Sequence, residues 1–201
     1  MTAFAKFCLF AVVGIVIGAG ALWFVGGKKH AYSTEFTLNA TPQQVFVFLS
    51  NPKYLKQWVS GLQEMDLIES RDDRGPQYEI VKNVRGRKVT MRQEVIKFVQ
   101  DSMIAMQIKN DSMVSTTIFR LEDVGEKTKV IYKVKEEGKG FMRILKPFQK
   151  SPVEERMREE SRMLKRILEK NLDKLDDDDL PVSPLAELAP DMGFEEVSPG
   201  N

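Results

Sequence analysis

Histidine and cysteine are almost absent from this chain of 201 residues, which contains one of each. Both Cys8 and His30 lie within the first 30 residues. A single cysteine forms no internal disulfide and no thiolate metal site. One histidine next to the N-terminal segment also excludes a Ser–His or Cys–His catalytic pair, and a histidine-based zinc or iron site, from the rest of the chain. We therefore predict no catalytic residue, no metal and no cofactor.

Signatures of phosphate and nucleic-acid binding are missing as well. No Gly-rich phosphate loop occurs, since Gly26-Gly27 only ends an apolar run. Basic residues form no dense cluster, so we expect no nucleic-acid partner. Acidic pairs such as Glu64 with Asp66 lie in strand-like segments and are typical of solvated charge. The length and a 42% hydrophobic content suit one globular domain with attachments.

Charge is divided unevenly along the chain. All 30 Lys and Arg residues precede Asp176, whereas eight of the 29 acidic residues follow Leu175, so the formal charge is +9 before that point and −8 after it. Residues 176–201 contain prolines and no basic residue, which predicts an acidic disordered tail. A short partner-binding motif within 185–194 is the alternative interpretation.

The N-terminal segment has no charged residue from Phe7 to Gly27. As a helix, this run would be roughly 30 Å long, about one bilayer core. We predict a single-pass membrane anchor over residues 1–29, in a plasma or inner membrane. A cleaved signal peptide is the alternative, although Trp23 continues the apolar run beyond a cut near Ala19–Ala21.

The side of the membrane is not determined, because Lys6 and the α-amine balance Lys28 and Lys29. Gly14 and Gly18 have the small-xxx-small spacing of helix pairs, which predicts a weak homodimer contact.

Residues 30–175 carry the patterns of an α+β domain. Thr41-Pro42 and Asn51-Pro52 are cap-then-proline signals, and they predict two short helices, over 42–49 and towards Trp58. Short turns between the later strands require antiparallel neighbours. The strands predicted by alternating polarity span 32–38, 62–69, 77–84, 87–98, 103–109, 112–122 and 127–136.

A long amphipathic helix is predicted to complete the domain. Ser151 is expected at its N-cap and Pro152 at its first position. Apolar residues then recur every three to four positions from Val153 to Leu175. A coiled-coil partner is the alternative, but Ser161 interrupts the short stripe. One helix on a strongly curved sheet leaves a cavity between them.

The opening of the domain resembles the SRPBCC superfamily, which includes START lipid-transfer domains, plant pollen allergens and polyketide cyclase/dehydrase-like proteins. The similar residues are Phe36-Thr-Leu-Asn-Ala-Thr-Pro-Gln-Gln-Val-Phe46, Leu49-Ser-Asn-Pro52 and Trp58. The similarity continues through Gly138–Pro147 into the last helix. It implies a helix-grip fold, with a curved seven-stranded antiparallel sheet around the C-terminal helix, and binding or processing of apolar small molecules.

Turn positions predict which side chains face the cavity. Two-residue turns at Arg85-Gly86 and Asn110-Asp111 would pair Ile80 with Met91, Tyr78 with Gln93, Ile108 with Met113 and Met106 with Ser115. The predicted ligand contacts are Trp58, Tyr78, Met91, Gln93, Met106, Ser115, Thr117, Phe119, Tyr132 and Phe141. Simple filling of the core is the alternative. The segment Phe141–Phe148 is a candidate lid, with capping of the core as its alternative.

The leading hypothesis is a membrane-anchored binding or transfer protein for a hydrophobic small molecule or lipid. The second is a cyclase/dehydrase-like enzyme in which Tyr78, Tyr132 or Gln93 positions the substrate by confinement. A third is a scaffolding membrane protein that uses the acidic tail as its contact.

Overall fold

The computed structural model describes residues 3–26, 30–71, 74–145 and 150–172 of the chain. Its centre is one seven-stranded antiparallel sheet with the strand order β1-β7-β6-β5-β4-β3-β2. The strands are β1 (His30–Leu38), β2 (Leu62–Arg71), β3 (Arg74–Val84), β4 (Arg87–Val99), β5 (Met103–Lys109), β6 (Met113–Asp123) and β7 (Thr128–Gly138). The predicted strands are confirmed, with ends that differ by a few residues.

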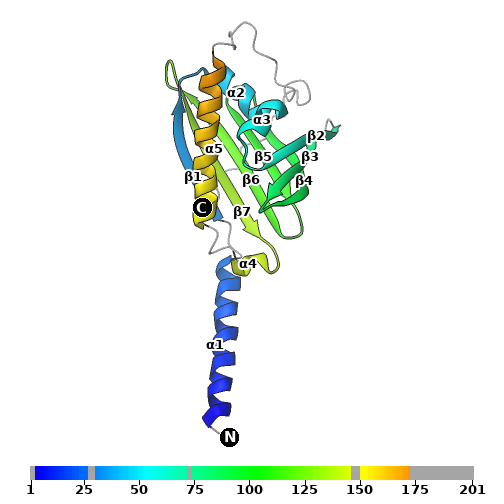
Figure 1. Ribbon diagram of the computed structural model, residues 1–201, viewed down its shortest axis with the longest axis vertical. Coiled ribbons are helices and arrows are strands. Elements are labelled where there is room, and N and C mark those ends of the chain that lie inside the picture. Colours follow the sequence, from blue (N-terminus) through cyan, green and yellow to red (C-terminus); the bar gives the residue numbers. More distant parts are fainter. Residues whose placement is uncertain (1–2, 27–29, 72–73, 146–149, 173–201) are drawn as a thin grey trace.

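The two short helices after β1 and the long C-terminal helix lie on the concave side of this sheet (Figure 1). The short helices α2 (Pro42–Ser50) and α3 (Pro52–Trp58) begin at the predicted caps: the Thr41 side chain accepts from the Gln44 amide, and Asn51 accepts from the Lys53 amide. The long helix α5 (Lys150–Asn171) runs beside β1 and α3. The α+β helix-grip architecture is therefore confirmed.

Two details near α5 differ from the sequence prediction. The helix begins at Lys150, so Ser151 lies inside it rather than at its N-cap. A short helix, α4 (Met142–Leu145), occupies part of the predicted lid segment, whose residues 146–148 lie outside the described residues.

Hairpin register was predicted correctly at one turn and incorrectly at the other. Ile80 pairs with Met91, as expected. At the β5–β6 turn, Ile108 pairs with Ser115 instead of Met113. The reason is that the Asn110 side chain accepts hydrogen bonds from the Ser112 and Met113 amides, which moves the two-residue turn to 111–112. Each residue of β5 therefore pairs with a residue of β6 two positions beyond the predicted one. A shift of two residues leaves every side chain on the same face, so the predicted inner face of both strands is unchanged.

The N-terminal helix α1 (Ala3–Gly26) projects away from the sheet, and α4 packs against it (Figure 1). No helix within the described ranges is both long and apolar enough to cross a membrane. The predicted membrane span is thus not supported; its last residue, Gly27, lies outside those ranges. The homodimer contact predicted at Gly14 and Gly18 is not supported either. The tail 176–201 also lies outside the described residues.

Candidate functional site

A cavity of about 270 Å³ lies between the sheet, α3 and α5. Several of its lining side chains are apolar and buried, among them Leu55 and Phe119. Two of its other lining residues, Val84 and Asn110, are exposed to solvent, which places the mouth near the ends of β3 and β5. The domain therefore encloses a mostly apolar hollow that is open at one end.

Eight of the ten predicted contact residues line this cavity: Trp58, Met91, Gln93, Met106, Ser115, Thr117, Phe119 and Tyr132. The other two do not. Tyr78 points into the buried core, where burial raises its pKa to about 12. Phe141 is 67% exposed. The alternation of side chains along each strand predicted the correct face of the sheet. It does not distinguish side chains that line a cavity from side chains that fill the core.

Three aromatic rings form one side of the cavity. Phe119 stacks on Tyr132 with ring centroids 4.4 Å apart, and it meets Trp58 edge to face at 5.7 Å. The Trp58 indole donates to the Phe48 carbonyl at 3.0 Å, so its polar atom is satisfied by the protein. A ligand in the cavity would therefore meet a rigid aromatic surface.

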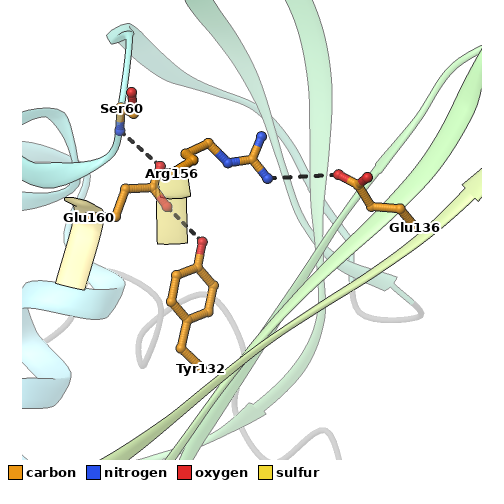
Figure 2. A network of polar contacts seen from close by, with 5 residues as sticks. All are labelled: Ser60, Tyr132, Glu136, Arg156 and Glu160. Carbon is orange, nitrogen blue, oxygen red and sulfur yellow. Dashed lines mark hydrogen bonds and ion pairs between the residues drawn. The ribbon is translucent and has the colours of Figure 1, made fainter. Parts of the chain in front are cut away.

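A buried carboxylate lies next to the Tyr132 ring (Figure 2). Glu160, on α5, is 3% exposed. Its Oε2 accepts a hydrogen bond from the Tyr132 hydroxyl at 2.7 Å, and its Oε1 accepts from the Ser60 amide at 3.0 Å. Burial, and then the neighbouring Glu160 charge, hold the Tyr132 pKa well above its usual value. This tyrosine remains a neutral donor at physiological pH.

A second buried carboxylate, Glu136 on β7, faces the guanidinium of Arg156 on α5 (Figure 2). The distance from Arg156 Nη2 to Glu136 Oε1 is 3.7 Å. The Glu136 side chain is 4% exposed and that of Arg156 is 40% exposed. This distance is that of an ion pair, and it is too long for a direct hydrogen bond. Two acids and one arginine thus border a mostly apolar hollow.

Lys82, on β3, is the fourth charged residue in the cavity wall. It shares the inner face of β3 with Ile80 and Val84, because side chains alternate along a strand. Burial lowers the pKa of Lys82; the Glu160 charge opposes this shift and the Arg156 charge adds to it. Within the described part of the chain, no group of three His, Cys, Asp or Glu side chains is arranged to hold a metal ion.

The corner between α3 and β2 positions the Ser60 amide that binds Glu160. Gly61 has a φ of +70°, and a Cβ at this position would lie 2.5 Å from the Asn83 carbonyl oxygen. The Asn83 amide in turn donates to the Gly61 carbonyl at 2.8 Å. Only glycine allows this corner to approach β3 so closely.

The charged residues of the cavity wall were not predicted from the sequence, although each of them leaves a signal there. Lys82 and Glu136 are in phase with buried apolar residues of their strands, and Glu160 lies in the apolar stripe between Met157 and Leu164. A charged residue in an apolar phase indicates either a partner or a functional role.

Three solved structures share the fold at low sequence identity. A START superfamily protein from Mycobacterium smegmatis is 16% identical, with a TM-score of 0.56, over 73% of this chain and 99% of its own. A protein from Thermus thermophilus is 17% identical, with a TM-score of 0.56 and the same two coverages. The di-domain ARO/CYC StfQ from the steffimycin biosynthetic pathway is 9% identical, with a TM-score of 0.58, over 72% of this chain and 52% of its own.

These identities establish the shared fold alone. No curated protein matches the sequence. A family model for polyketide cyclase / dehydrase and lipid transport proteins matches residues 29–177, which include the whole sheet, the cavity and α5. The chain therefore belongs to the polyketide cyclase / dehydrase and lipid transport family.

Proposed function

We propose that this protein binds a hydrophobic small molecule in the cavity between its sheet and α5, as a carrier rather than as a catalyst. The observation that carries the proposal is the hollow of about 270 Å³ behind a mouth at Val84 and Asn110. A well-packed domain has few voids larger than a water molecule. An open apolar hollow of this size is typical of a ligand site.

The volume limits the size of the guest. A cavity of about 270 Å³ lies at the lower end of the range of small-molecule pockets, which is about 300–1,000 Å³. We therefore expect a single medium-length chain or a small ring system rather than a two-chain lipid.

We further propose that α1 attaches the domain to a membrane. Its side chains Phe10, Ile15 and Ile17 are apolar and largely exposed, and the uncharged run continues to Gly27. Exposed apolar surface of this extent favours a bilayer over water. Liposome flotation of the full chain checks this: the wild type is expected to float, and the double variant Ile15→Lys/Ile17→Lys is expected to remain at the bottom of the gradient. Equal flotation of both proteins would refute the attachment.

The contact between Tyr132 and Glu160 favours one alternative function, an enzyme of the cyclase/dehydrase type. A neutral tyrosine and a carboxylate 2.7 Å apart in a cavity could orient or protonate a reactive substrate. Turnover of an aromatic polyketide precursor that disappears in Tyr132→Phe, with binding retained, would favour this alternative.

Extraction of the purified full chain followed by mass spectrometry tests the carrier function. We expect a copurifying apolar molecule, and we expect Ser115→Phe to exclude it because the ring would occupy the hollow. The matched control is Thr116→Phe, one residue along on the opposite face of β6, which should retain the molecule. A wild-type protein that neither retains nor takes up any apolar molecule would refute the proposal.

A further inference from the structure

The four charged residues of the cavity wall are not equally satisfied by the protein. Both oxygens of Glu160 accept short hydrogen bonds, from Ser60 and Tyr132. Glu136 is buried and lies opposite Arg156. The two carboxylates thus have partners within the protein, and neither needs a ligand to compensate for its burial.

The two cations retain spare donors. A guanidinium has five N–H donors and an ammonium has three. Arg156 meets Glu136 only across 3.7 Å. For Lys82, no hydrogen bond or ion pair is present among residues 30–71, 74–145 and 150–172. Both side chains nevertheless line the cavity, where each lost contact with water has a free-energy cost.

We propose that the ligand is an amphiphile with one carboxylate, which Lys82 and Arg156 bind while the apolar body lies against Trp58 and Phe119. This inference rests on the proposed carrier function and specifies its ligand class. The carboxylate supplies acceptors for Lys82, which has no hydrogen-bond or ion-pair partner in the described residues, and for Arg156, whose 3.7 Å ion pair with Glu136 leaves most of its donors unused. Charge-assisted hydrogen bonds of this kind are short and strong.

The electrostatics of the site agree with this assignment. Burial and the nearby Arg156 charge both lower the pKa of Lys82, and the negative charge of Glu160 only partly opposes them. A bound anion would favour the protonated lysine, so carboxylate binding should be accompanied by retention of the Lys82 proton.

The test compares two probes of nearly equal size, decanoate and decan-1-ol, whose binding to the full chain is measured by titration calorimetry at neutral pH. We expect the wild type to bind decanoate at least tenfold more tightly than decan-1-ol. Lys82→Met should weaken decanoate binding by about tenfold and leave decan-1-ol binding unchanged. Arg156→Met should act in the same direction.

The matched control is Lys133→Met, which removes one positive charge from the outer face of β7 and should bind both probes like the wild type. Equal affinities of the wild type for decanoate and decan-1-ol, or equal losses of both in Lys82→Met, would overturn the carboxylate site and leave the carrier function intact. Failure of both probes to bind would overturn the carboxylate site, and the carrier function would fail with it only if extraction of the wild type also yields no apolar molecule.

Discussion

The aromatic side of the cavity and its charged side contribute to the stability of the fold with opposite signs. Around Phe119 and Trp58, apolar rings are fully buried and stack on one another, so their burial stabilises the fold. Around Lys82 and Arg156, the lysine has no hydrogen-bond or ion-pair partner in the described residues and the arginine only a 3.7 Å ion pair with Glu136, so the burial of the lysine costs stability. The comparison shows that one surface of the hollow holds the domain together, whereas the other is retained at an energetic cost and is thus the better candidate for recognition.

The largest effect is expected on the aromatic side. Phe119 is 1% exposed, and Phe119→Ala should reduce the free energy of unfolding by about 3–5 kcal/mol, because it removes two ring contacts and enlarges the hollow. Urea denaturation measures this loss. Phe141→Ala removes the same atoms from an exposed position and should change stability by less than about 0.5 kcal/mol. Equal losses in the two variants would contradict the aromatic role.

The next largest loss of stability is expected when Glu160 is replaced. Glu160→Leu leaves the Tyr132 hydroxyl and the Ser60 amide without their acceptor, so we expect a loss of about 3 kcal/mol in urea denaturation. Glu160→Gln keeps one acceptor oxygen and should lose clearly less. If the glutamine variant were as unstable as the leucine variant, the negative charge rather than the hydrogen bonds would be what matters at this position.

The smallest effect, with the opposite sign, is expected on the charged side. Because the pKa of Lys82 is lowered on folding, the folded state disfavours its charge, and Lys82→Met should stabilise the domain by about 1 kcal/mol at neutral pH. Between the lowered pKa and the ordinary value of 10.5, the unfolded chain binds more protons than the folded one, so wild-type stability rises with pH relative to the variant.

The difference between wild type and Lys82→Met should therefore narrow as the pH approaches 10.5. Thermal unfolding of both proteins from about pH 7 to about pH 10 measures it. A variant less stable than the wild type at neutral pH would mean that Lys82 has a stabilising partner, and the contrast between the two sides of the cavity would fail.

Local sequence signals were sufficient to predict the elements of this fold. Thr41 with Gln44, and Asn51, begin the helices that they predict, because capping depends on residues within three positions. The Arg85-Gly86 turn is also local, and the register of β3 with β4 follows from it. At the next hairpin, two turns were possible with the same inner face, and the Asn110 side chain selects between them.

The charged part of the site was not predictable in this way. Glu160 lies in an apolar stripe, but its partners Ser60 and Tyr132 are 100 and 28 residues away in the chain. Pairing over such distances depends on how α5 packs across the sheet, and periodicity contains no information about it. For the same reason, Tyr78 lies on the predicted inner face of the sheet, but its side chain is part of the core and does not line the cavity.

The corner at Gly61 has a consequence for how this protein tolerates change. Because Gly61 has no Cβ atom, the turn after α3 packs directly against the Asn83 backbone. The adjacent Ser60 amide is thereby close enough to donate a hydrogen bond to the Glu160 carboxylate on α5. An alanine at position 61 would push the turn outward and withdraw that donor, although Gly61 does not line the cavity. Among related sequences, glycine at this corner is consequently expected to accompany glutamate on the helix, and the loss of one should permit the loss of the other.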